Sequence, residues 1–242
     1  MTFSIVAHCR RTGQLGVTVA TAVPAVGSMC PYVKSGVGAV STQSWVNPYL
    51  AIEALRLMES GKSGPEALDI VMAKDDGRDL RQIGIVDALG RSAAWSGKSC
   101  TDWFGQIVEP HFAVQGNMLV SAPTVEAMAE AFRRSETLDL AERLLLALEA
   151  GEAAGGDKRG RQSASLRVHH IEDYALVDLR VDEHHHPVAE LRRVFKIARL
   201  QLLPFVEGMP KKGGPGAATP DSVVQLLGMP PPHRPGGGGS AP

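Results

Sequence analysis

Two short runs rich in β-branched residues open the chain, and they constrain its fold more than any other stretch. The runs are Thr2–Ala7 and Leu15–Thr21, and a polar connection over residues 10–14 joins them. Partly alternating apolar positions on both sides of a short polar connection predict a β-hairpin. A terminus is ordinarily the frayed end of a chain, but here the apolar pattern begins at once, so we expect this end to lie inside a sheet.

The threonine at position 2 has a chemical interpretation besides the structural one. Removal of Met1, which is usual ahead of a small residue, leaves Thr2 with both a hydroxyl and a free α-amino group. An α-amine has a pKa of about 7.7–8.0, so near neutral pH it can accept the proton of its own hydroxyl. Threonine is also common in strands. The stretch alone therefore leaves two interpretations open, a nucleophile or an ordinary strand residue.

Length and composition predict one folded domain with an appendage. The chain has 242 residues, of which 44% are apolar, and this is enough for a single sizeable core. From Pro204 onward the composition shifts to proline and glycine, ending in four consecutive glycines at 236–239. We therefore expect one folded domain over residues 1–203 and a largely disordered tail over residues 204–242.

Charge and residue usage argue against several partners. The net charge of −1 gives no electrostatic basis for binding nucleic acid or an anionic membrane, and no apolar run is long enough to span a bilayer. Without a signal-like N-terminus, Cys9, Cys30 and Cys100 indicate reduced thiols in a cytoplasmic protein. Three consecutive histidines at 184–186 point in different directions and do not make a chelating set. No metal or cofactor is expected.

Apolar periodicity in the rest of the chain alternates between blocks of strands and groups of helices. Helix-capping patterns are clear at Asn47 before Pro48 and at Ser63 three residues before Glu66. The other predicted strands cover residues 36–44, 80–86, 91–95, 112–119, 165–169 and 175–181, with a short strand inside the mixed segment 22–35. The predicted helices cover 49–60, 64–73, 125–134, 138–150 and 188–203. Blocks of mainly antiparallel strands with helices between them predict an α+β fold, a four-layer α-β-β-α sandwich.

Polar residues at expected strand ends form the candidate site. Gln43 ends one predicted strand, and Asn117 follows a glycine inside another; amides in such places can stabilise an oxyanion. Residues 155–164 carry one acidic and three basic side chains between glycines, and this segment runs directly into a strand. Its charged groups are therefore expected at a sheet end, where ligand sites gather, although an exposed loop is the simpler interpretation.

Several of these motifs occur together in one known family. They comprise the N-terminal Thr-Phe-Ser-Ile-Val-Ala, the hairpin Thr-Gly-Gln-Leu-Gly-Val, residues 36–40 with Thr42-Gln43, and residues 115–118, 155–164, 178–182, 184 and 187–191. Over about residues 2–195 the chain resembles the bacterial and archaeal family catalogued as domain of unknown function 1028. That family is assigned to the N-terminal-nucleophile hydrolase superfamily, so the resemblance implies the α-β-β-α sandwich and Thr2 as nucleophile.

The resemblance supports roles for specific side chains. With Thr2 as the attacking group, Gln43 and Asn117 are the expected oxyanion donors, because amide N–H groups stabilise a tetrahedral oxyanion. The residues expected to orient the amine or hold a substrate carboxylate are Asp157, Arg159, Arg161, Asp182 and His184. Lys34 lies near the place where proteasome-like relatives keep an activating lysine, but no motif aligns the two, and we assign it no role.

Three functions remain in competition at this point. The first is an amidohydrolase acting on a small amide or a short peptide through Thr2. The second is a non-catalytic ligand-binding or scaffold protein that retains the sandwich, with Thr2 incidental. The third, a cysteine hydrolase, lacks a matching histidine motif. By analogy with sandwich proteins of this superfamily, a homo-oligomer is expected.

Overall fold

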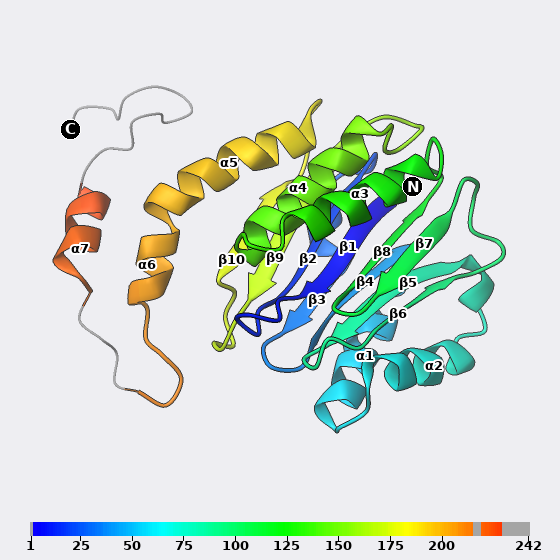
Figure 1. The fold of residues 1–242 in the computed structure, drawn as a ribbon, viewed down its shortest axis with the longest axis horizontal. Helices are drawn as coiled ribbons and strands as arrows, with labels where there is room; N and C mark the ends of the chain where they lie inside the picture. Colours follow the sequence, from blue (N-terminus) through cyan, green and yellow to red (C-terminus); the bar gives the residue numbers. More distant parts are fainter. Residues whose placement is uncertain (1, 215–218, 229–242) are drawn as a thin grey trace. The chain divides into compact units, whose positions relative to one another are not determined.

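The computed structural model describes residues 2–214 and 219–228, and the chain divides into two compact units, residues 1–195 and 196–242. The first unit is a mixed α/β structure built around two antiparallel sheets (Figure 1). Its strands are β1 (Thr2–His8), β2 (Leu15–Thr21), β3 (Pro31–Lys34), β4 (Gly38–Ser44), β5 (Arg81–Asp87), β6 (Ser92–Ser96), β7 (Gly105–Glu109), β8 (Phe112–Asn117), β9 (Ser163–His169) and β10 (Val177–Val181).

The predicted N-terminal hairpin forms the middle of the larger sheet. Its six strands lie in the order β10-β9-β2-β1-β8-β7, so β1 has a hydrogen-bonded neighbour on each side. Every residue of β1 and of β2 is buried. The sequence-based expectation that this end of the chain lies inside a sheet is therefore confirmed for Thr2, while Met1 lies outside the described residues.

The smaller sheet has four strands in the order β3-β4-β5-β6, and the helices α1 (Pro48–Glu59) and α2 (Gly64–Lys74) pack on it. Both predicted caps are present. The side chain of Asn47 accepts a hydrogen bond from the Tyr49 N–H, and Ser63 and Glu66 form a reciprocal capping box. These local patterns fix where the two helices begin.

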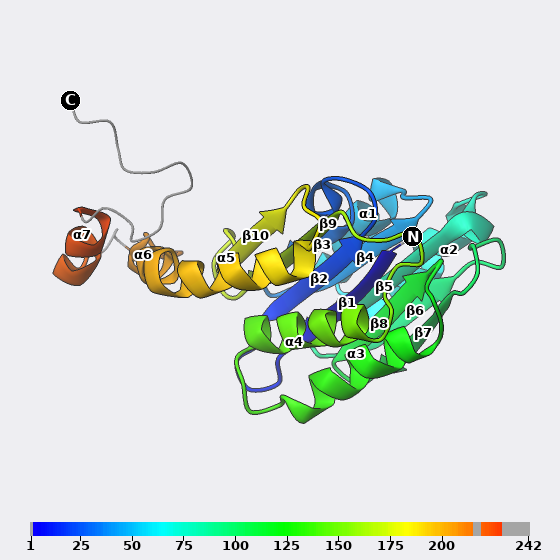
Figure 2. The same cartoon turned by 90° about the horizontal axis from the view of Figure 1, so that it is seen from above.

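Helices cover the outer face of each sheet, and the inner faces of the sheets pack against each other (Figure 2). The helices α3 (Pro123–Arg134) and α4 (Leu140–Ala153) pack on the six-stranded sheet. Contacts of β1 with β4 and of β5 with β8 join the sheets. One part of the inter-sheet core is apolar, formed by Val6, Leu15, Val17, Ala39, Val86 and Ala113.

One strand of the first unit, β7, was not predicted from the sequence. β7 pairs only with β8 at the sheet edge, and its residues alternate between half-buried and exposed. An edge strand of five residues buries too little apolar surface to show a clear pattern. The helix α5 (Pro187–Gln201) begins in this unit, where Arg192 pairs with Glu142 and Glu149 of α4.

The second unit contains α6 (Leu203–Gly208) and α7 (Asp221–Gly228). The second of these begins directly after Pro220, inside the tail that the composition predicts to be largely disordered. The disorder expected for the rest of the tail falls largely on residues 215–218 and 229–242, which lie outside the described residues. Within the part of the chain that the structure describes, no helix combines the length and apolar character needed to cross a bilayer.

Candidate functional site

Thr2 lies at the first position of β1, between two other polar side chains. The strand register places Thr21 of β2 opposite it on one side and Asn117 of β8 on the other. Because side chains alternate along a strand, Thr2 shares a face with Ser4, which bonds to the opposite sheet. The Thr2 side chain therefore faces the inter-sheet space. Its hydroxyl donates to the Thr21 hydroxyl at 3.3 Å, and the residue is 6% exposed.

Gln43 connects the two sheets directly beneath Thr2. Its Nε2 donates to the main-chain carbonyl of Thr2 at 3.1 Å and to Gln82 Oε1 at 2.8 Å. Its Oε1 accepts from the Ser4 hydroxyl at 2.6 Å. An amide nitrogen has two protons, so these two contacts use both of them. In this arrangement Gln43 fixes the backbone of Thr2 and has no N–H left for a substrate.

Gln82 is the centre of the amide network, and sequence reasoning did not select it. Its Oε1 accepts from Asn117 Nδ2 at 2.8 Å, and its Nε2 donates to Ser96 Oγ and to the Gly116 carbonyl, both at 2.8 Å. The side chain has no exposed surface. The only sequence signal was an amide immediately before the apolar run Ile83-Gly-Ile-Val.

Gln115 completes the network from the six-stranded sheet. Its Nε2 donates to the Ser4 hydroxyl at 2.6 Å. Its side chain occupies the space over Gly84 of β5, where a Cβ atom would lie 2.0 Å from Gln115 Oε1. Glycine at 84 thus lets an amide from one sheet reach the surface of the other.

A buried network of this kind is costly to build unless its polar atoms are bonded. Apolar side chains of similar size could fill the same space, as they do in the rest of the inter-sheet core. The polar part lies at the Thr2 end, and among the described residues one N–H of Asn117 Nδ2 has no recorded acceptor. Asn117 adjoins Thr2 in the register, which makes this N–H available to a group bound beside the Thr2 hydroxyl.

The loop over residues 155–162 lies at the same end of the six-stranded sheet. Gly155 and Gly156 have φ angles of +123° and +56°, conformations that favour glycine. The Asp157 carboxylate, which is almost fully buried, accepts from the Ala22 N–H at 2.9 Å and from the Arg159 N–H at 2.8 Å. Asp157 thereby holds the loop against the end of β2, next to Thr21.

The other predicted binding residues surround this loop. Arg161 pairs with Glu152 of α4 at 3.3 Å, and burial raises the pKa of that glutamate. The Gln162 N–H donates to the Thr21 carbonyl, and the His184 N–H donates to the Gln162 carbonyl. Asp182 accepts from the Ala25 N–H through its main-chain carbonyl. All of the predicted site residues thus come from segments that meet at the Thr2 end of the sheet.

Lys34 lies elsewhere. It pairs with Gly38 at the opposite end of β4 from Gln43, and its ammonium bonds to Glu59 at 2.5 Å. The three cysteines are buried and free, and burial raises the pKa of Cys30 to about 12. Over residues 2–214 and 219–228, no group of three or more His, Cys, Asp or Glu side chains is arranged to hold a metal ion.

Comparison with known proteins places the chain in a family. The model of the "Family of unknown function (DUF1028)" matches residues 2–191. The chain belongs to this family. The crystal structure of the DUF1028 protein SPO2555 from Silicibacter pomeroyi is similar, with a TM-score of 0.80 and 31% sequence identity over 86% of this chain and 94% of that one.

A second solved structure is similar only at a low level. It is Anbu (ancestral beta-subunit) from Yersinia bercovieri, with a TM-score of 0.39 and 10% identity over 88% of this chain and 100% of that one. A likeness of this size supports no argument about activity. A comparison with curated proteins found no match.

The DUF1028 site therefore has to be interpreted from its own chemistry. It brings together a hydroxyl, a neighbouring hydroxyl, one amide N–H and a set of charged groups on the adjoining loop. A hydroxyl at the second residue gains a built-in base once the preceding residue is removed. The same groups can also bind a polar ligand by hydrogen bonds alone.

Proposed function

We propose that this DUF1028 protein is an N-terminal-nucleophile hydrolase that cleaves a small amide or a short peptide, with Thr2 as its nucleophile. The observation that carries the proposal is the place of Thr2, at the end of the central strand and facing the inter-sheet space above a buried amide network. The order of helix, sheet, sheet and helix in the first unit agrees with the α-β-β-α sandwich of that superfamily.

In the proposed reaction, Met1 is first removed, which frees the α-amino group of Thr2. Thr2 Oγ1 then attacks the substrate carbonyl carbon while its proton passes to the α-amine. The amine returns this proton to the leaving nitrogen as the C–N bond breaks, and an ester on Thr2 remains. Water attacks this ester with the same amine as base, releasing the acid and restoring the Thr2 hydroxyl.

The tetrahedral intermediate needs hydrogen-bond donors that are already in place. We assign this role to the second N–H of Asn117 Nδ2, because its first N–H is held by Gln82 at 2.8 Å. Gln43, which we expected as a donor to the oxyanion, is proposed instead as a positioning residue, since it holds the Thr2 carbonyl at 3.1 Å.

The charged loop supplies the proposed substrate-binding groups. Arg161 is the residue best suited to bind a substrate carboxylate, because it is about half exposed and its present partner, Glu152, has a pKa raised by burial. Arg159, Asp182 and His184 would complete the polar edge of the site. Asp157 is proposed to hold the loop in place, because its carboxylate bonds to two main-chain N–H groups.

One observation favours the alternative, a non-catalytic ligand-binding or scaffold protein. Thr2 is only 6% exposed, and its hydroxyl donates to Thr21. In that case the loop over residues 155–162 would bind a ligand or a second subunit, and Thr2 would serve only the fold. The two functions differ in whether the Thr2 hydroxyl is required.

A variant series separates them. The wild-type protein, Thr2→Ser and Thr2→Ala are assayed on a panel of N-acyl amino acids, dipeptides and anilides, with Thr137→Ala, which changes an exposed threonine, as control. Serine and alanine are both small enough for Met1 removal, so Thr2→Ser keeps a hydroxyl beside the free α-amine and Thr2→Ala has none. Hydrolysis retained in Thr2→Ser and lost in Thr2→Ala supports the proposal. Hydrolysis that persists in Thr2→Ala would contradict the proposal.

A further inference from the structure

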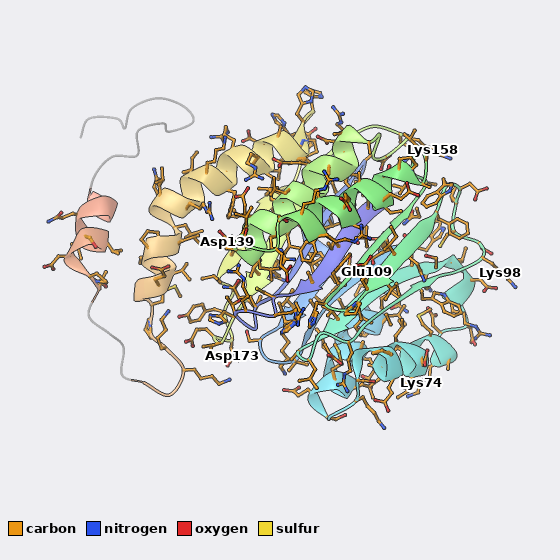
Figure 3. The ribbon with its side chains drawn as sticks, in the orientation of Figure 1. Lys74, Lys98, Glu109, Asp139, Lys158 and Asp173 are labelled. Atoms are coloured by element: carbon orange, nitrogen blue, oxygen red, sulfur yellow. The ribbon has the colours of Figure 1, made fainter. Side chains whose placement is uncertain are left out.

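A cavity lies at the opposite end of β1 from Thr2. It has a volume of about 380 Å³ and is bounded by the β1–β2 turn, the β7–β8 turn, α3 and α4. β1 spans seven residues, so the cavity is about 20 Å from the Thr2 hydroxyl. In Figure 3, Lys158 of the loop over residues 155–162 and Asp139, the N-cap of α4, lie near opposite ends of α4. The cavity is therefore distinct from the proposed active site.

The cavity wall carries an excess of positive charge. Four arginines line it against one acidic residue, Glu136. Arg133 is already neutralised by Glu109 and Glu130. Among the described residues, no ion pair involves Arg10, Arg11 or Arg143. Three cationic groups therefore face one small space without a protein carboxylate bound to them.

Arg143 is a buried part of the cavity wall. The residue is 7% exposed, and its guanidinium lies 3.9 Å from the centre of the Phe132 ring. Nη2 donates to the Phe132 carbonyl at 3.3 Å, while the buried Nε–H has no acceptor among the described residues. Burial lowers the pKa of this guanidinium. A buried cation with an unused donor is costly to leave without an anionic partner.

Two histidines continue the polar wall. His8 Nδ1 and His111 Nδ1 lie 3.0 Å apart, and the rings stack with centroids separated by 5.3 Å. One of the two nitrogens must carry a proton and the other must accept it, so the pair shares one hydrogen bond. Burial lowers the pKa of both imidazoles. Because both rings line the cavity, their NMR resonances respond to a charge that enters it.

We propose that this cavity binds a small oxyanion, a phosphate or carboxylate group carried by a small molecule, between Arg10, Arg11 and Arg143. Guanidinium groups present paired N–H donors whose spacing matches the oxygens of both anions. The volume is at the lower end of the range for ligand pockets and suits a compact molecule. The Nε–H of Arg143 supplies a donor that the protein itself does not use.

The test is a titration of the full chain with sodium orthophosphate and, separately, sodium succinate, at an ionic strength held constant with sodium chloride. Imidazole resonances of His8 and His111 are followed by NMR, with exposed His185, which belongs to neither site, as internal reference. We expect saturable shifts confined to His8 and His111. The anion that saturates at the lower concentration identifies the preferred group.

The Arg10→Gln/Arg11→Gln double variant tests the proposed ligands without disturbing the core, because both side chains are exposed. It should weaken binding about tenfold or more. Arg134→Gln, which changes an exposed arginine on α3 outside this cavity, should leave binding unchanged. The proposal is wrong if neither anion shifts the two imidazoles, if chloride shifts them equally, or if the folded double variant binds as well as the wild type.

Discussion

Replacing Gln82 with leucine tests whether the amide network stabilises the Thr2 end of the fold. Gln82 Oε1 accepts from Gln43 and Asn117, and its Nε2 donates to Ser96 and to the Gly116 carbonyl, all at 2.8 Å. Leucine has similar volume and no polar atom, so the N–H groups of Gln43 and Asn117 and the Gly116 carbonyl lose these partners. A buried polar group left unsatisfied costs about 1–3 kcal/mol, so the three losses together lower the free energy of unfolding by about 3 kcal/mol or more.

Urea unfolding measures this loss as a shift in midpoint at an unchanged slope. Gln106→Leu is the matched control, because Gln106 bonds to Ser96 and to the Ala94 carbonyl from an exposed position. The control should stay within about 0.5 kcal/mol of the wild type. A loss below about 1 kcal/mol in Gln82→Leu, or one equal to the control, would refute the idea that the network is structurally costly to break.

Three further predictions follow from individual positions. Gly84→Ala places a Cβ 2.0 Å from Gln115 Oε1 and should lower the free energy of unfolding by about 1–3 kcal/mol, measured by chemical unfolding. The double variant Gly84→Ala/Gln115→Ala should lose less than the sum of the two single variants, and additive losses would contradict the contact. Burial lowers the pKa of His169 from 6.5 to about 4, so as the pH falls this imidazole takes up a proton in the unfolded chain before it does so in the folded protein. The free energy of unfolding should therefore fall by about 2–3 kcal/mol between pH 6.5 and 4.5 in the wild type. The fall should be smaller in His169→Gln and unchanged in His185→Gln, and equal pH slopes in all three proteins would refute this. Because burial raises the pKa of Cys30 to about 12, iodoacetamide at pH 8 should leave this thiol unmodified in the folded protein, and peptide mapping that finds rapid alkylation would contradict its burial.

Patterns that depend on near neighbours in the chain were predictable from the sequence. The N-terminal hairpin follows from two alternating runs around a polar turn, and its strands were observed as β1 and β2. The starts of α1 and α2 follow from Asn47 and from the Ser63–Glu66 box, because the capping hydrogen bonds span only two or three residues. Such interactions depend only on residues that are close together in the sequence.

Contacts between distant segments were not predictable. Gln82 belongs to the site because β5 faces β8 across the inter-sheet space, and no local pattern encodes that pairing. The sequence predicts that Asp157 orients the amine or holds a substrate carboxylate, but it does not predict the bonds from main-chain N–H groups of Ala22 and Arg159 to its carboxylate. The role of a polar side chain depends on which groups the fold brings to it, and for Asp157 these come from the end of β2.

The most direct test of the central claim is the covalent state of the N-terminal residue. The protein is purified from a bacterial host, treated with a β-lactone that acylates activated hydroxyls, and analysed by intact mass and N-terminal peptide sequencing. The account predicts a chain that begins at Thr2 and gains the mass of one β-lactone on that residue, with no adduct in Thr2→Ala. A chain that keeps Met1, or an adduct on another residue, would contradict the assignment of Thr2 as nucleophile.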